Sequence, residues 1–188
     1  MILVEQVMNG GAVLQNGIVV RRAVIPDYRG IEELVNKHKF QTAEGKKVGA
    51  LILLSYKEIA DLIWDGAFYV ADAAGPFEVG EEAYAVPRKI VACGGFVEYD
   101  GIPEVRSFVT DEQYRGNGLQ TLILQAVLES VRQKSYDRVY TLANPDAVGF
   151  FQKNGFVESD IPFAKQSRDC AICPVYDLCD EVALVRYL

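Results

Sequence analysis

The sequence predicts one α+β domain, in which helices flank a mixed, mainly antiparallel sheet. The chain has 188 residues, half of them hydrophobic, which is enough for one well-packed core. Strand-like and helix-like patterns alternate along it without an internal repeat or a linker. The strongest helical pattern starts at Leu119, directly after a strand-like segment and a turn that contains two glycines.

Six segments are predicted as strands because they are rich in β-branched and aromatic residues and end at turn residues. They are 18–23, 67–72, 89–99, the central segment 105–109, 138–143 and 181–188. The pair Gly94-Gly95 interrupts the third of these strands. Its glycines indicate a β-bulge, a close crossing of two segments or a contact with a ligand, and these alternatives stay open. The pair Asp100-Gly101 predicts a hairpin turn into the central strand.

Four helices are predicted. A proline opens the first, over 26–39, and Ser55 is the expected N-cap of the second, over 56–64. The long helix is the third, and the fourth starts at Pro145 and ends at 154–155, where a glycine provides a stop signal.

Composition excludes several classes of function. The formal charge of −7, from 26 acidic against 19 basic residues, argues against a nucleic-acid surface. No apolar run approaches the length of a membrane span, and residues 1–17 lack the basic flank of a signal peptide. We therefore expect a cytoplasmic protein without nucleic-acid or membrane partners, with an added strand or arm over 1–17. A homodimer remains open.

The turn over 113–119 is the best candidate for a binding site. The first N–H groups of a helix lack intrahelical partners and carry partial positive charge. Because Gly116 and Gly118 have no side chains, a phosphate can approach those groups closely, and Arg115 adds a planar fork of donors. The alternative is a glycine turn that merely joins a strand to a helix, but we favour phosphate binding.

Gln113, Gly116 and Gly118 complete the pattern Q/R-x-x-G-x-G/A. This order resembles the acyl-CoA-binding pattern of the GCN5-related N-acetyltransferase (GNAT) superfamily. Dinucleotide and nucleoside-triphosphate motifs fit less well, because Thr121 stands where a G-x-G-x-x-G motif needs its last glycine and no G-K-[ST] follows.

Two further segments, 141–145 and 150–156, resemble the next strand and the short helix of that superfamily. The likeness covers about residues 18–188. It implies a GNAT domain over 18–188, an N-terminal extension over 1–17, and an enzyme that transfers an acetyl group from acetyl-CoA to the amino group of a small acceptor.

The resemblance also implies roles for single residues. The backbone N–H of Phe108 or Val109 would meet the thioester oxygen, and Asn144 would bond the pantetheine arm. Phe151 stands where many members carry the tyrosine that protonates the leaving thiolate, so that route is in doubt. The expected contacts with the cofactor come from Phe108, Val109, Gln113, Tyr114, Arg115, Gly116, Asn117, Gly118, Leu119, Asn144 and Phe151.

Two charged residues of the central strand suit the acceptor amine. Glu104 could act as a general base through water, although a solvent-facing carboxylate is the plain alternative. Arg106 could bind a substrate carboxylate with two parallel hydrogen bonds, or could pair with Glu104 instead.

A narrower resemblance bears on the acceptor. The run 104–109, Phe151 and the tail from 161 with its cysteine segment resemble stand-alone amino-acid acetyltransferases of the N-acetylglutamate synthase type. It implies acetylation of glutamate, the entry step of arginine biosynthesis, with Arg106, Ser107 and Lys165 binding the substrate. The alternatives are a GNAT that acts on protein N-termini, polyamines or aminoglycosides, and a non-catalytic acyl-CoA-binding module.

Four cysteines without a signal peptide suggest a reducing compartment. Cys93 lies in an apolar run and is expected to be an inert core thiol. Cys170, Cys173 and Cys179 have the spacing of part of a zinc site but no evident fourth ligand. A metal, an oxidisable pair and free thiols all remain open, and no metal ligand is assigned.

Overall fold

The computed structural model of the chain describes residues 4–7, 11–14, 17–37, 56–73, 89–160 and 180–188. The strands are β1 (Val4–Val7), β2 (Gly11–Leu14), β3 (Ile18–Arg22), β4 (Phe68–Ala73), β5 (Lys89–Tyr99), β6 (Ile102–Thr110), β7 (Arg138–Ala143), β8 (Val157–Glu158) and β9 (Val182–Tyr187). The helices are α1 (Tyr28–Lys37), α2 (Tyr56–Trp64), α3 (Leu119–Gln133) and α4 (Pro145–Lys153), with single 3-10 turns at η1 (Ile25–Asp27) and η2 (Glu112–Tyr114).

The described strands form one sheet in the order β1-β2-β3-β4-β5-β6-β7-β9-β8. Every neighbouring pair is antiparallel except β6 and β7, which run parallel. The predicted α+β domain with a mixed, mainly antiparallel sheet is therefore confirmed.

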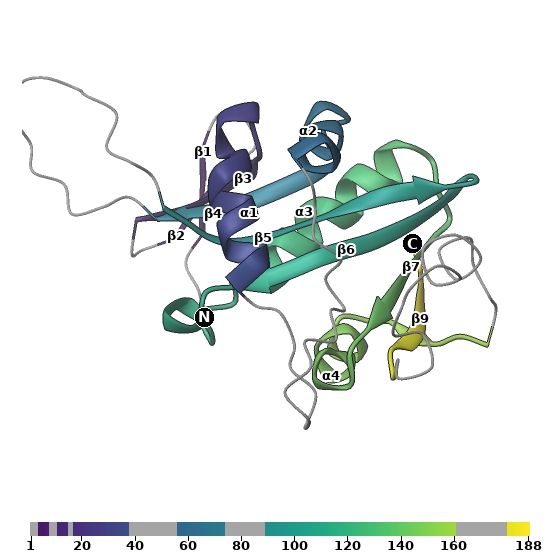
Figure 1. Ribbon diagram of the computed structural model, residues 1–188. Helices are drawn as coiled ribbons and strands as arrows, with labels where there is room; N and C mark the ends of the chain where they lie inside the picture. The colour runs from purple at the N-terminus through teal and green to yellow at the C-terminus, as the bar shows by residue number, and fades with distance from the viewer. Residues whose placement is uncertain (1–3, 8–10, 15–16, 38–55, 74–88, 161–179) are drawn as a thin grey trace, which may run out of the picture.

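The helices cover both faces of the sheet (Figure 1). On one face, which we call the α1/α2 face, Ile31 and Ile59 of the two helices pack against Phe68, Val70 and Val109 of the strands. On the other, the α3/α4 face, the core consists of apolar side chains that include Ile123, Val127, Phe96, Val105 and Phe151. Each helix is fixed by its apolar side, as the 3.6-residue periodicity predicts.

Several predicted elements match the structure residue for residue, among them α2, β5 and β7. The turn between β5 and β6 has φ values of 51° at Asp100 and 79° at Gly101, as a tight hairpin turn requires. Strand β5 is continuous through Gly94-Gly95, and its register with β6 shifts at this pair. A Cβ built on Gly95 would lie 2.5 Å from the carbonyl oxygen of Ala67, so glycine is needed for a close approach to β4.

The predicted N-terminal arm contributes two strands to the same sheet. β1 pairs with β2, and β2 pairs with β3, both antiparallel, so the segment lengthens the sheet at the β3 edge. The sequence analysis did not predict η2 or β8. The predicted first helix begins as η1 and continues as α1, and its predicted last residues lie outside the described residues. Ser55, the expected N-cap of the second helix, also lies outside them.

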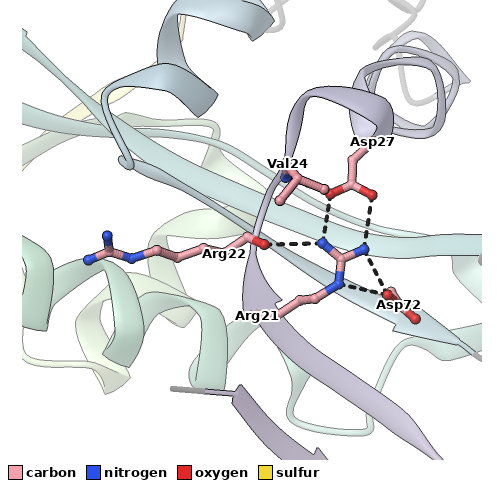
Figure 2. Close-up of polar contacts among 5 residues, drawn as sticks. All are labelled: Arg21, Arg22, Val24, Asp27 and Asp72. Carbon is pink, nitrogen blue, oxygen red and sulfur yellow. Dashed lines mark hydrogen bonds and ion pairs between the residues drawn. The ribbon is translucent and has the colours of Figure 1, made fainter. Parts of the chain in front are cut away.

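An arginine clamp ties α1 to the sheet (Figure 2). Arg21 on β3 donates from Nη1 and Nη2 to the carboxylate of Asp27 at 2.7 and 2.9 Å, and from Nε to Asp72 on β4 at 2.8 Å. Asp27 also accepts from the backbone N–H of Val24 at 2.8 Å. These contacts raise the pKa of Arg21 and hold the start of α1 beside the sheet. In the part of the chain that is described, no helix is long and apolar enough to cross a membrane.

Candidate active site

The candidate site is built around a bulge in β6. The register between β5 and β6 runs from Cys93 opposite Val109 to Gly95 opposite Arg106, so one residue of β5 faces two of β6. Ser107, one of those two, has a φ of 59°, in the left-handed region that few residues other than glycine adopt. This is the geometry of a β-bulge, which leaves its extra residue outside the ladder and turns the strand.

Gly94 makes room for the bulge. A Cβ built on Gly94 would lie 3.0 Å from three atoms of the Phe108 ring, so any larger residue would press against that ring. The sequence analysis left a bulge, a close crossing and a ligand contact open for the glycine pair. The structure shows both a bulge, opposite Gly94, and a close crossing, at Gly95.

The bulge changes which face each side chain of β6 occupies. Val105 and Phe108 both pack on the α3/α4 face, although they are three residues apart. Val109 lies on the α1/α2 face. Because side chains alternate along a strand, Glu104 and Arg106, the neighbours of Val105, lie on the α1/α2 face as well. Strand β6 thus presents the aromatic ring of Phe108 on the α3/α4 face and the charged groups of Glu104 and Arg106 on the α1/α2 face.

Beyond Glu104, β6 separates from β7. Their only register pair is Glu104 opposite Tyr140, and the two strands diverge towards their C-terminal ends (Figure 1). Asp111 N–H donates to the carbonyl of Val91 on β5 at 2.8 Å, and the Val109 N–H is directed at the Cys93 thiol. Since backbone N–H groups alternate in direction along a strand, that of Thr110, between Val109 and Asp111, points towards β7.

The turn after β6 leads directly into α3. Gly116 and Gly118 have φ values of 79° and 71°, and Gly118 is the N-cap of the helix. The Asn117 side chain donates to the carbonyl of Tyr114 at 3.1 Å and so braces the turn. A Cβ on Gly116 would meet nothing within 4 Å, so the backbone there is open to an approaching group. Such a turn fits a phosphate, because free N–H groups and a helix dipole point outward.

Of the other predicted contacts in this turn, Gln113 and Arg115 have exposed side chains and Tyr114 is half-buried. Leu119 is 2% exposed and belongs to the α3/α4 core, so it contributes backbone and not side chain to the turn.

A buried carboxylate, Asp111, anchors the turn. Its Oδ1 accepts from the N–H of Gln113 at 3.1 Å, and its Oδ2 lies 3.4 Å from Nζ of Lys37 and 3.2 Å from Nζ of Lys89. Burial alone would raise the pKa of Asp111, but the Gln113 hydrogen bond and the two ammonium groups outweigh it, so the pKa lies below its usual value. Asp111 therefore connects α1, β5 and the turn.

Glu104 and Arg106 lie just before the bulge. Glu104 is 1% exposed, which excludes the solvent-facing alternative. Arg106 is half-buried and donates from Nη1 to the hydroxyl of Tyr99 at 2.7 Å. A neutral hydroxyl orients the guanidinium without cancelling its charge, so Arg106 keeps its ability to bind an anion.

Four aromatic rings pack together on the α3/α4 face. The ring of Phe151 lies 5.9 Å from that of Phe108, 5.1 Å from that of Phe150 and 5.2 Å from that of Phe156. Phe151 is 4% exposed, so its position offers an apolar wall beside β6 and no proton donor. Asn144 is the N-cap of α4, and its carbonyl accepts from two helix N–H groups, at 2.8 and 3.1 Å.

The structure thus brings Glu104, Arg106 and the bulge at Ser107 and Phe108 together on β6, next to the turn. Sequence reasoning did not identify Tyr99, Asp111 or Gln120 as part of this region. An aspartate two residues before Gln113 is a recognisable capping pattern, but the partners of Tyr99 and Gln120 have no local signal. Lys165 lies outside the described residues.

Cys170, Cys173 and Cys179 also lie outside them, and within the described ranges no three potential metal ligands cluster.

Comparisons with known proteins agree with this geometry. The acetyltransferase (GNAT) family model matches residues 45–156, more than half of the chain. The N-acetyltransferase CT2212 of Chlorobaculum tepidum is 27% identical over 143 residues, which cover 74% of this chain and 81% of that protein.

Two solved structures share the fold. Rv2747 from Mycobacterium tuberculosis, in complex with CoA, aligns with a TM-score of 0.61 and 22% identity over 90% of this chain and 98% of that one. The N-acetylglutamate synthase of Neisseria gonorrhoeae, complexed with coenzyme A and N-acetyl-glutamate, aligns with a TM-score of 0.64 and 14% identity over 91% of this chain and 35% of that one. The chain therefore belongs to the GNAT acetyltransferase family, and it is an N-acetyltransferase with acetyl-CoA as its co-substrate.

Proposed function

We propose that this N-acetyltransferase acetylates the amino group of a small amino acid such as glutamate, which would give it a place at the entry to arginine biosynthesis. The observation that carries the proposal is the position of Arg106 and Glu104. Both lie on the α1/α2 face of β6, directly before the bulge, where a carboxylate-binding group and a proton acceptor would flank one amine.

On the acyl side, the turn over 113–119 holds the diphosphate of acetyl-CoA, and the pantetheine arm lies between the diverging strands. We place the Phe108 N–H towards β7, whereas Val109 is paired with Cys93 on β5 and its N–H is directed there. Of the two predicted oxyanion donors, Phe108 is therefore the one we assign to the thioester oxygen. A fixed donor aimed at developing negative charge is the most effective contribution that a backbone can make to acyl transfer.

On the acceptor side, Arg106 binds the substrate carboxylate. The hydrogen bond to Tyr99 holds the guanidinium in one orientation, so less conformational entropy is lost when the carboxylate arrives. Ser107 and Lys165 are retained from the sequence analysis as further substrate contacts.

The chemical step requires a neutral amine. Glu104 accepts a proton from the substrate ammonium through water, after which the amine nitrogen attacks the thioester carbon. The nitrogen then gives its second proton to water as the C–S bond breaks. Phe151 supplies no hydroxyl, so the leaving thiolate takes its proton from water. A thiol with a pKa of about 8.5 is a tolerable leaving group near neutral pH.

The similarity to an N-acetylglutamate synthase complexed with N-acetyl-glutamate supports this acceptor class at the level of the fold. Phe151 is buried and leaves the family's usual acid position without a hydroxyl, which is why the proton for the leaving thiolate is assigned to water. The alternative acceptors are amines without a carboxylate, such as polyamines, aminoglycosides or protein N-termini.

The test is release of CoA from acetyl-CoA in the presence of single amino acids and of amines without a carboxylate. We expect glutamate to give the highest kcat/KM. In Arg106→Ala, the KM for the acceptor should rise by about 10- to 100-fold, the loss expected for a charge-assisted hydrogen-bonded pair, while the Kd for acetyl-CoA stays unchanged. Turnover only with amines that lack a carboxylate would refute the acceptor class. Binding of acetyl-CoA without turnover of any amine would refute the catalytic roles proposed for Glu104 and Phe108.

A further inference from the structure

A buried acceptor oxygen lies on the first turn of α3. Oε1 of Gln120 is shielded from solvent and meets no hydrogen-bond donor among the described residues. Buried polar atoms are nearly always hydrogen-bonded, because burying an acceptor without a donor is costly. An exception of this kind, in a protein that binds a co-substrate nearby, indicates where the missing donor comes from.

The nitrogen end of the same side chain is fixed. Nε2 of Gln120 lies 2.7 Å from Oγ1 of Thr110 and 3.5 Å from the carbonyl oxygen of Cys93. A carbonyl oxygen can only accept, so the contact with Cys93 identifies which end of the amide is the nitrogen. The protein therefore fixes the orientation of the Gln120 side chain, and the oxygen is the end of the amide that remains to bind a ligand.

The position of Gln120 indicates which part of the co-substrate it meets. In the proposed function, the thioester lies at Phe108 and the diphosphate at the turn that begins after Asp111. Thr110, which accepts a hydrogen bond from Gln120, lies on β6 between the thioester and the diphosphate. The pantetheine arm joins the thioester to the diphosphate, so it must pass this residue.

The chemistry of the arm agrees with that position. A phosphate at neutral pH offers almost only acceptor oxygens and would repel Oε1, whereas the arm carries two amide N–H groups and a hydroxyl. We propose that Oε1 of Gln120 accepts a hydrogen bond from one of these donors and so is a specific contact for the pantetheine arm. This inference rests on the proposed placement of acetyl-CoA along β6 and the turn.

The structural alternative is that Gln120 only fastens α3 to the end of β6, with a buried water on Oε1. Two variants separate these roles. Gln120→Met keeps the length of the side chain and removes the acceptor together with the amide nitrogen. Thr110→Val is the control, because it removes one of the two partners of the nitrogen end, while the contact with the Cys93 carbonyl and the Oε1 acceptor remain.

The experiment is calorimetric titration with two probes, acetyl-CoA and adenosine 3′,5′-bisphosphate, which keeps the nucleotide and the 3′-phosphate but lacks the arm. In Gln120→Met, the Kd for acetyl-CoA should rise by about three- to tenfold, the usual weight of one hydrogen bond, while the Kd for the bisphosphate stays unchanged. Thr110→Val should leave both values near those of the wild type.

Three results would overturn the inference: equal losses for both probes, no loss for either, or a loss of acetyl-CoA affinity in Thr110→Val as large as in Gln120→Met. Failure of the proposed function looks different, because the wild-type protein would then bind acetyl-CoA without any acceptor being turned over.

Discussion

The phosphate-binding role of the turn can be tested with two glycines that differ only in location. Gly116 lies in the turn and Gly101 in the β5–β6 hairpin, and both have a φ of 79° and open space within 4 Å of a built Cβ. Alanine at either position meets the same backbone strain and no steric clash. Gly101→Ala is therefore a matched control for Gly116→Ala.

The magnitudes follow from this match. A non-glycine residue in the left-handed region costs about 1–2 kcal/mol, so each variant should lower the melting temperature by about 2–8 °C. Only Gly116→Ala places a methyl group where a phosphate would approach. Loss of one charge-assisted hydrogen bond, about 1.5–3 kcal/mol, should raise the Kd for acetyl-CoA by about 10- to 150-fold.

The assay is titration calorimetry of both variants with acetyl-CoA, together with thermal unfolding by circular dichroism. The reasoning would be refuted if the two alanine variants bound acetyl-CoA equally well, whether both match the wild type or both are weakened. Equal decreases in the melting temperatures of the two variants would show that both substitutions introduce the same backbone strain.

Two predictions concern stability. Arg21→Met leaves two largely buried carboxylates without their shared cation, so urea unfolding should show a loss of about 3 kcal/mol. Lys57→Met breaks an exposed pair and should leave the free energy of unfolding nearly unchanged; similar losses in both variants would contradict a role for burial. The pKa of Asp111 is lowered in the folded state. Its charge therefore stabilises the protein above the unfolded-state pKa of about 3.9, and this contribution is lost as the pH falls through the lower pKa of the folded state. Asp111→Asn should therefore be less stable than the wild type at pH 7, with a difference that shrinks below about pH 4; a constant difference down to pH 3 would contradict this.

Local patterns in the sequence predicted most of the fold. The limits of α2, β5 and β7 match because capping residues, glycines and prolines mark them, and the Asp100-Gly101 turn has the positive φ values that these residues favour. The buried side of α1 was also predicted, since Ile31, Leu34 and Val35 recur at helical spacing. Signals of this kind act over a few residues, so a sequence displays them directly.

Tertiary partners were not predictable in the same way. Asp111 is joined to Lys37 and Lys89, residues 74 and 22 positions away, and nothing near any of the three indicates the others. Arg106 was expected to meet either a substrate or Glu104, and its hydroxyl partner, Tyr99, is brought close only by the hairpin. The acetyl-CoA turn could be proposed from the sequence because its glycines and its basic residue are contiguous there.

The bulge at Ser107 divides the side chains of β6 between the two faces of the sheet. Without the extra residue, strict alternation would put Phe108 on the same face as Glu104 and Arg106. Cys93 holds the bulge in place, since its sulfur lies 3.5 Å from the carbonyl oxygen of Ser107 and receives the Val109 N–H. Burial raises the pKa of this thiol to about 12, so it stays protonated and can donate to that carbonyl. Cys93, which the sequence suggests is an inert core thiol, therefore contacts both residues that flank Phe108, Ser107 and Val109.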